Sequence, residues 1–300
     1  MAGGALTVLH TSDLQCGAPF LHTAAEALVR LARRISPDVV VCSGDLTQRA
    51  KGREFRTARE LLTRLGPAPT IVTPGNHDVP LYRVWERLAS PYRKWRRFAG
   101  PALDTATRVD GATFVALDSA APRRRIVNGR LREEQIAFAR RSFATAPAGD
   151  LRIVVTHHHL VPVPGGEGSP PLPGATKHVR AFEEMGVDVV LGGHVHQLHL
   201  RTSADVEGAL LAASAAVHAP GDVPSRVLPI LACGTTTSKR GRGPEVGWNS
   251  LCVLEFEEAR VRVTPYLRAP GAPDFESIDP IDFGPLACGR RRMALPEEAR

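Results

Sequence analysis

Polar side chains that can hold a cation recur in this sequence where apolar runs end. Asp13 and Gln15 follow one such run, and Asp45 follows another after Gly44. Three further runs lead into the segments Gly75-Asn76-His77-Asp78, His157-His158-His159 and His194-Val195-His196. A carboxylate at the end of a buried strand costs free energy unless a cation or hydrogen-bond donors meet it. These residue types therefore predict either metal ligation or a hydrogen-bonded polar cluster.

Each segment has a plainer explanation when it is taken alone. An aspartate after a strand is commonly a helix cap, and Asn-His-Asp after Pro-Gly is typical of a turn. A His-x-His pair in a strand can be two hydrogen-bonded structural histidines. Ligands of an open α/β sheet, however, bind at the carboxyl ends of its strands. Five strand ends of this kind in one chain favour a single shared site.

The order of the segments resembles that of the calcineurin-like metallophosphoesterase superfamily. The sequential blocks of that superfamily are D-x-H, G-D, G-N-H-[DE], H and G-H-x-H, and the resemblance covers about residues 6–217. It implies an α/β fold, a four-layer α/β/β/α sandwich of two mixed sheets flanked by helices. It also implies a centre of two divalent metal ions.

The resemblance implies a role for each matching residue. The first metal would be held by Asp13, Gln15, Asp45 and His196, and the second by Asp45, Asn76, His157 and His194, with Asp45 bridging. A hydroxide between the ions would attack a phosphodiester, because two cations roughly 3.5–4 Å apart can hold both the attacking and the leaving oxygen. His77 would protonate the leaving alkoxide as general acid, and Asp78 would fix the tautomer of His77. Mixed carboxylate, amide and imidazole ligands suit Mn, Fe or Zn.

Gln15 departs from the family pattern, which has His at this position. An amide oxygen is a poorer ligand than imidazole for borderline metals, so the first site should favour a harder ion such as Mn. Alternatively, Gln15 hydrogen-bonds a metal-bound water. A second choice also stays open: His159 is the alternative to His157 as a ligand, since strand alternation aims both to the same side. His158 either contacts substrate or fills space.

Other segments bear on the substrate. The sequences GNHDVPLY, THHHLVP and GTTTSKRGRG, together with Asn128-Gly129-Arg130-Leu131 and Gln135, resemble the bacterial class III cyclic-nucleotide phosphodiesterase branch. Cyclic nucleotides or similar small phosphodiesters are therefore the expected substrates. Arg240 and Arg242 would reach a substrate phosphate, unless the loop Gly234–Gly243 is only a flexible solvated loop.

Two other functions stay open. One is a DNA-repair-type nuclease of the same superfamily with nucleic acid as its partner, which is less favoured because no chain length remains for further capping or coiled-coil segments. The other is a non-catalytic scaffold of the same fold. Scaffolds can lose the general acid, whereas this chain keeps His77 and Asp78.

Residues 79–100 read as a basic helix interleaved with aromatics. The simpler interpretation is an amphipathic surface helix whose aromatic rings are partly buried. The functional one is a platform on which Arg93, Lys94, Arg96 and Arg97 steer phosphate while the aromatics stack a base.

Alternating strands and helices must position these residues. The expected strands are Ala5–Leu9, Asp38–Cys42, Thr70–Thr73, Thr113–Leu117, Leu151–Thr156 and Val187–Leu191. The expected helices are Thr23–Ile35, Arg53–Leu65, Leu81–Phe98, Leu131–Phe143 and Lys177–Met185. This alternation is typical of an α/β core. After Gly193, four further strands predict an added antiparallel-rich sheet: Leu210–Val217, Val227–Cys233, Leu251–Glu257 and Arg260–Leu267.

Composition bounds the rest of the prediction. We expect one domain over residues 1–268 and a Pro, Gly and Arg-rich tail over 269–300, partly disordered, with an irregular loop at Val161–Gly174. The net charge of +7 attracts anions such as phosphate esters and nucleic acid. Five scattered cysteines, no signal-peptide pattern and no long apolar run predict a cytoplasmic protein without disulfides or a membrane span. A dimer is left open.

Overall fold

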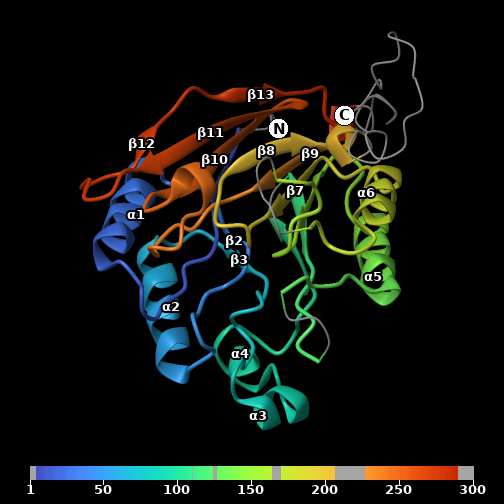
Figure 1. Cartoon of the computed structure of the whole chain (residues 1–300). Helices are drawn as coiled ribbons and strands as arrows, with labels where there is room; N and C mark the ends of the chain where they lie inside the picture. Colours follow the sequence, from blue (N-terminus) through green and yellow to red (C-terminus); the bar gives the residue numbers. More distant parts are fainter. Residues whose placement is uncertain (1–4, 110, 124–126, 164–169, 207–226, 290–300) are drawn as a thin grey trace, which may run out of the picture.

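Two sheets lie between pairs of helices in the computed structural model, which describes residues 5–109, 111–123, 127–163, 170–206 and 227–289. Helices α1 (His22–Ile35) and α2 (Gly52–Arg64) lie on one side, and α5 (Glu133–Ala144) and α6 (Ala175–Glu184) lie on the other (Figure 1). The predicted four-layer α/β/β/α sandwich is therefore confirmed.

The first sheet has seven strands, in the order β12-β11-β10-β1-β2-β3 with β13 also paired to β11. These strands are β1 (Leu6–Thr11), β2 (Val39–Cys42), β3 (Thr70–Val72), β10 (Asn249–Glu257), β11 (Arg260–Arg268), β12 (Glu276–Ser277) and β13 (Ile281–Phe283). β1, β2 and β3 run parallel, and β10 pairs antiparallel with β1. The carboxyl ends of the three parallel strands therefore meet at one edge.

The second sheet has six strands, in the order β4-β5-β6-β7-β9-β8. These strands are β4 (Thr105–Val109), β5 (Ala112–Ala116), β6 (Leu151–Val155), β7 (Val189–Gly192), β8 (His199–Thr202) and β9 (Pro229–Ala232). The four inner strands β5, β6, β7 and β9 are parallel, and the two edge strands are antiparallel. The inner strands are buried along their length, as the continuous apolar runs of the sequence predict.

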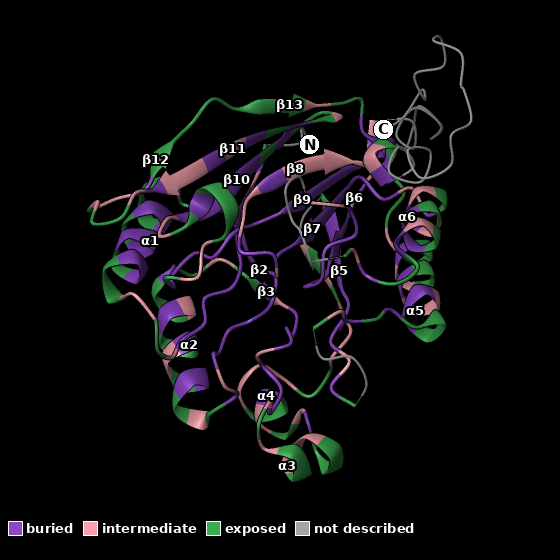
Figure 2. Cartoon of the chain, viewed as in Figure 1, coloured by how far each residue is buried: buried purple, intermediate pink, exposed green. Residues whose placement is uncertain are grey.

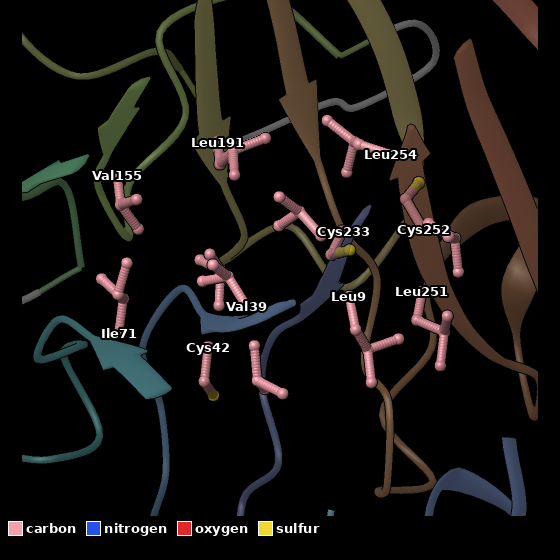
Figure 3. Close-up of a cluster of buried hydrophobic side chains, with 14 of the residues drawn as sticks. Leu9, Val39, Cys42, Ile71, Val155, Leu191, Cys233, Leu251, Cys252 and Leu254 are labelled. Carbon is pink, nitrogen blue, oxygen red and sulfur yellow. The ribbon is translucent and has the colours of Figure 1, made fainter. Parts of the chain in front are cut away.

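One buried apolar cluster joins the two sheets. It contains Leu9 of β1 and Val39 of β2 together with Val155 of β6 and Leu191 of β7 (Figure 3). A second cluster packs Phe143 of α5 and Phe182 of α6 onto the outer face of the second sheet. The strands are accordingly mostly buried, and exposed residues gather on the outer faces of the helices (Figure 2). The two sheets thus pack against each other through a shared apolar core.

The predicted helix over Leu81–Phe98 is wrong as one element. The chain forms two short helices here, α3 (Val84–Ala89) and α4 (Arg93–Phe98), which lie at one end of the molecule (Figure 1). Pro91 explains the break, because its ring lacks an N–H and disfavours helical backbone at the preceding residue. Ser90 indeed leaves the helical region, with φ −149° and ψ 63°.

The later strands do not form a sheet of their own, so that prediction is also wrong. β8 and β9 extend the second sheet, while β10 and β11 extend the first. The strand predicted at Leu210–Val217 lies outside the described residues, as do residues 164–169 of the predicted loop. Sequence reasoning missed β4 and β8, which are short edge strands.

Part of the predicted tail pairs with the first sheet. β12 and β13 both bond β11, and Leu286 and Cys288 are buried. Residues 290–300 lie outside the described residues, and the domain boundary at residue 268 stays a prediction. All five cysteines are buried, and none forms a disulfide. Among the helices that the structure describes, none has the length and apolarity needed to cross a membrane.

Candidate metal centre

The structure brings the predicted ligands together at the carboxyl ends of strands from both sheets. Asp13, Asp45 and Asn76 follow β1, β2 and β3 of the first sheet. The histidines follow β6 and β7 of the second sheet, at positions 157, 194 and 196. All of these side chains are buried except that of His194, which is partly exposed. Residues more than a hundred positions apart in sequence thus share one enclosed polar site.

The backbone at these strand ends is unusual. Five of the eight non-glycine residues with positive φ in the described chain are predicted ligands: Asp13 (51°), Gln15 (46°), Asp45 (52°), His194 (76°) and His196 (58°). A left-handed conformation costs a non-glycine residue about 1 kcal/mol or more, and it persists where the surrounding structure enforces it. Such residues cluster at functional sites, which is where this chain places them.

Two glycines make room for ligands from neighbouring strands. A Cβ on Gly75 would lie 2.1 Å from Asp45 Oδ1, and a Cβ on Gly44 would lie 2.5 Å from His157 Nδ1. Gly44 also has φ +94°, which L side chains rarely adopt. The strand-end glycines that accompany the ligands in the sequence therefore allow the close approach of the ligands themselves.

Asp45 lies between two groups of ligand atoms. Its Oδ1 accepts a hydrogen bond from His77 N at 2.8 Å and lies 3.5 Å from His157 Nε2. Its Oδ2 lies 3.4 Å from Gln15 Nε2 on the other side. The two oxygens of one carboxylate thus face different neighbours, as a bridging ligand requires.

The first group consists of Asp13, Asp45 and His196, whose ligand atoms all lie within 4.8 Å of one another. Asp13 Oδ2 accepts hydrogen bonds from Ser12 Oγ and His194 N, whereas Oδ1 has no hydrogen-bond donor and lies 3.3 Å from His196 Nε2. A fully buried carboxylate oxygen without a donor is costly. This group therefore fits a cation.

Gln15 lies beside the first group, and a hydrogen bond with Ser238 orients its side-chain amide. Its Oε1 accepts from Ser238 Oγ at 3.1 Å, and its Nε2 lies 3.3 Å from His196 Nε2. A serine hydroxyl can accept as well as donate. Exchange of the two amide ends would therefore keep the Ser238 contact and turn Oε1 toward the first group.

The second group forms around Asn76. Asn76 Oδ1 lies 3.1 Å from His157 Nε2 and 3.0 Å from His194 Nδ1. His157 already donates its Nδ1–H to the Ser43 carbonyl at 2.8 Å, so its neutral ring presents a lone pair at Nε2. Two acceptors at this distance repel each other unless a proton or a metal cation lies between them. The second group therefore also fits a cation.

The pKa values of the three histidines shift in two directions. Burial opposes a charge on His157, but the carboxylates of Asp45 and Asp13 outweigh it and raise its pKa. Burial lowers the pKa of His196 to about 4, against the opposing effect of Asp13. Burial, reinforced by the neighbouring histidines, also holds the pKa of His194 well below its ordinary value. His194 and His196 are therefore held as neutral imidazoles, which is the form that ligates metals.

The contacts of the three consecutive histidines differ in the structure. His157 Nε2 faces Asn76 and Asp45, which supports it as the ligand, whereas the ring of His159 stacks on that of His194 at 5.9 Å. His158 bonds Ser119 Oγ through Nδ1, and its Nε2 is buried without a hydrogen-bond partner. Its ring nitrogen also groups with His157 and His194 within 4.8 Å, a placement that the sequence reasoning had not assigned to metal ligation.

The role predicted for Asp78 needs correction. Its carboxylate accepts from the backbone N–H groups of Leu46, Thr47 and Gly75 and from Thr47 Oγ1. It therefore ties the loops after β2 and β3 together and does not contact the ring of His77. Consecutive residues of this tight turn point in different directions, which sequence adjacency cannot reveal.

The ring of His77 is fixed by a residue that sequence reasoning missed. His77 Nδ1 donates to the Gln48 carbonyl at 2.9 Å, and Nε2 lies 3.3 Å from Arg240 Nη1. The side chain of Gln48 also contacts Arg240, at 3.4 Å. The residue type of Gln48 does not predict this role, because its backbone carbonyl, and not its side chain, accepts the hydrogen bond.

The loop over residues 234–243 is bonded into the site. Thr235 and Thr237 donate to the carbonyls of Asp13 and Leu14, so the loop supports the first ligand segment. Arg240 is placed beside His77, as described above. The backbone N–H of Arg242 donates to His196 O, and its side chain is exposed. Both predicted substrate-binding arginines thus lie next to the candidate metal centre.

Comparisons with known proteins match this geometry. The model of the calcineurin-like phosphoesterase family matches residues 6–198. A probable cyclic nucleotide phosphodiesterase of Synechococcus is 28% identical over 191 residues, which are 59% of this chain and 65% of that protein. A cAMP/cGMP dual specificity phosphodiesterase of Mycobacterium tuberculosis is 28% identical over 218 residues, 63% of this chain and 61% of that protein. The chain thus matches less than two thirds of the length of either relative.

Solved structures with a similar fold include two phosphatases. Purple acid phosphatase from yellow lupin seeds aligns with a TM-score of 0.64 at 15% identity, covering 93% of this chain and 54% of that one. A dimetal phosphatase from Danio rerio aligns with a TM-score of 0.53 at 13% identity, covering 91% of this chain and 98% of that one. At these identities the likeness concerns the fold.

Proposed function

The chain belongs to the calcineurin-like phosphoesterase family, and from this membership we propose that it is a dinuclear metal-dependent phosphodiesterase acting on cyclic nucleotides or similar small phosphodiesters. Proteins of this family are hydrolases that use two divalent cations. The observation that carries the proposal is the placement of Asp45, whose two oxygens face separate groups of buried ligand atoms. The names of the two curated relatives support the substrate class.

The proposal gives each ligand the following place. Asp13, Gln15, Asp45 and His196 hold the first cation, and Asp45, Asn76, His157 and His194 hold the second. Mn is favoured over Fe or Zn because Gln15 offers an amide where an imidazole would suit a softer ion. Bound cations would supply an activated water and offset the negative charge that develops on the phosphoryl oxygens.

Protein side chains supply the remaining steps. His77 is the general acid, since its Nε2 faces the site while Nδ1 is anchored on the Gln48 carbonyl. Arg240, next to Nε2, is positioned to contact a phosphate oxygen and so to hold the leaving group near the acid. Arg242 extends the positive rim of the site. His158 is placed to contact either substrate or the second cation.

Hydrolysis with added Mn tests this function. The chain should hydrolyse bis-p-nitrophenyl phosphate, and Asp45→Ala should abolish the activity because both cations lose a ligand. Asp279→Ala, which removes an exposed carboxylate between β12 and β13, is the matched control and should keep full activity. Full activity in Asp45→Ala would refute the two-metal centre.

A substrate panel tests the specificity. It should contain 2′,3′- and 3′,5′-cyclic nucleotides, single-stranded DNA and nitrophenyl diesters. We expect the cyclic nucleotides to have the highest kcat/KM. A clear preference for DNA would favour the nuclease alternative, and no turnover of any diester, despite bound metal, would favour the scaffold.

A further inference from the structure

A second polar pocket lies away from the predicted ligands. It is formed by α4, the segment after β5 and the start of α5, and its volume is about 560 Å³. Its main lining residues are Tyr92, Arg93, Arg96, Asp118, Arg123 and Arg132. None of the residues assigned to the metal centre lines it.

Four guanidinium groups from three separate segments surround this pocket. Glu86 is the acidic group nearest Arg93, at 3.6 Å, and it is already paired more closely with Arg83 and Lys94. Arg123 uses its Nε–H on the Leu88 carbonyl. Within the described ranges, no carboxylate forms an ion pair with Arg96, Arg123 or Arg132.

One carboxylate lies on the wall of the pocket. Asp118 is fully buried and accepts hydrogen bonds from Tyr92 Oη at 2.7 Å and from Ala120 N at 2.9 Å. Burial raises the pKa of Asp118 to about 7, so the group is partly protonated at neutral pH. Four guanidinium groups and one buried carboxylate therefore line the pocket, and positive groups are in excess.

We propose that this pocket binds a small oligophosphate anion, a molecule with two or more linked phosphates. Each guanidinium can hold a phosphate through two parallel hydrogen bonds. The volume falls in the range of small-ligand sites and exceeds what a single phosphate would fill. Several linked phosphates match the positive charge of arginines that reach one pocket from α4, from residue 123 and from residue 132.

Calorimetric titration of the full-length metal-loaded protein with pyrophosphate tests the site. Arg96→Ala and Arg132→Ala should each weaken binding by roughly tenfold or more, because each removes a charge-assisted pair. Arg97→Ala is the matched control: Arg97 lies on the same helix but over the Phe98 ring, outside the pocket, and the variant should keep wild-type affinity.

Asp45→Ala separates this site from the metal centre. It should lose phosphodiester hydrolysis and retain pyrophosphate binding, so the proposed function and the second site can fail independently. Loss of pyrophosphate binding in Asp45→Ala with normal binding in the arginine variants would place the anion at the metal centre and overturn the proposal. Absence of binding to the wild type would do the same.

Parallel titrations with ATP and AMP identify the source of the phosphates. Similar affinities for pyrophosphate and ATP, with weaker binding of AMP, would show recognition of linked phosphates alone. Tighter binding of ATP would show that the pocket also holds the nucleoside. AMP binding as tightly as ATP would contradict the oligophosphate assignment.

If Arg132→Ala unfolds at assay temperature, Arg132→Lys replaces it as the test variant. Lysine keeps the positive charge but lacks the planar guanidinium that makes two parallel hydrogen bonds, so this variant should bind pyrophosphate with intermediate affinity.

Discussion

The amide of Gln15 is held by Ser238 in one of two orientations that the same hydroxyl can support. In one, Nε2 points to the first group of ligands, and in the other Oε1 does. Only the second orientation ligates a metal, and binding would select it. In the proposed centre, the departure from the family's histidine would therefore keep a ligand at this position but make it a weaker one.

Replacing Gln15 by His should tighten the binding of the first metal, by roughly tenfold. The imidazole is a better ligand for borderline ions, and His196 and Asp45 already face this position. Calorimetric titration of the metal-free protein with Mn and Zn measures the effect, which should be larger for Zn. Unchanged affinity for both metals would mean that Gln15 lies outside the coordination sphere.

His77→Ala should separate substrates by their leaving groups. An alkoxide departs slowly without a proton, whereas nitrophenolate needs little protonation, so cyclic nucleotides should be slowed by roughly 10²–10⁴-fold and nitrophenyl esters much less. Steady-state kinetics on both substrates checks this. Equal slowing would argue that His77 positions substrate instead of donating a proton.

At the level of elements, the site depends on how closely strand ends approach one another. The turn after β3 passes so near Asp45 that a single methyl group at Gly75 would meet both its Oδ1 and its backbone N–H. The sequence shows these glycines only as companions of the ligands. Their function becomes visible when neighbouring strands are placed together.

Gly75→Ala should therefore lower metal content and activity by displacing Asp45. We expect loss of most Mn-dependent hydrolysis with a smaller effect on thermal unfolding, measured by elemental analysis and calorimetry. Gly52→Ala at the start of α2 is the matched control, since its Cβ would meet nothing nearer than 3.8 Å. Wild-type metal content in Gly75→Ala would show that the turn can shift without moving Asp45.

The sequence predicted most elements of the fold within a few residues, because long β-branched runs and amphipathic helices have strong periodic patterns. It failed where the signal was weak or interrupted. β4 is a five-residue edge strand whose residues alternate between half-buried and exposed, and Pro91 splits a helix that otherwise keeps its period. The assignment of the later strands to two different sheets depends on long-range pairing, which local pattern does not encode.

The sequence predicted those parts of the site that depend on the type of the side chain. Carboxylates, amides and imidazoles at strand ends predicted the candidate ligands, and the structure brings these side chains together. The anchor of His77 was not predictable, because a backbone carbonyl at Gln48 provides it. The direction in which the Asp78 carboxylate points was not predictable either, since it depends on the backbone path of the turn that follows β3.

On the scale of the whole molecule, a hydrogen-bonded junction between the two sheets, formed around His10 and Ser43, links the stability of the fold to the candidate metal centre. His10 of β1 is fully buried there, with Nε2 3.0 Å from Ser43 Oγ and Nδ1 3.5 Å from Cys233 Sγ. Ser43 Oγ also donates to the Gly192 carbonyl in the second sheet, and Ser43 O receives the Nδ1–H of His157. One hydrogen-bonded chain thus runs from the core between the sheets to a predicted ligand.

This junction should make the fold sensitive to acid. Burial, partly opposed by the Gly192 carbonyl, lowers the pKa of His10 to about 3 from 6.5. In the unfolded chain His10 takes up a proton below about pH 6.5, whereas the folded chain resists protonation down to about pH 3. The stability that His10 contributes is therefore complete above that range and is lost progressively as pH falls through it.

Urea unfolding at pH 7 and pH 5 should reveal this contribution. Wild type should lose about 2 kcal/mol more unfolding free energy between these pH values than His10→Gln, which cannot be protonated. His10→Phe, a second neutral replacement, should show the same flattened dependence even if packing makes it less stable at both pH values. Because other buried histidines titrate equally in all three proteins, the difference in slope isolates His10. Parallel loss in wild type and both variants would mean that protonation of His10 does not limit stability and that the junction between the sheets accommodates the charge.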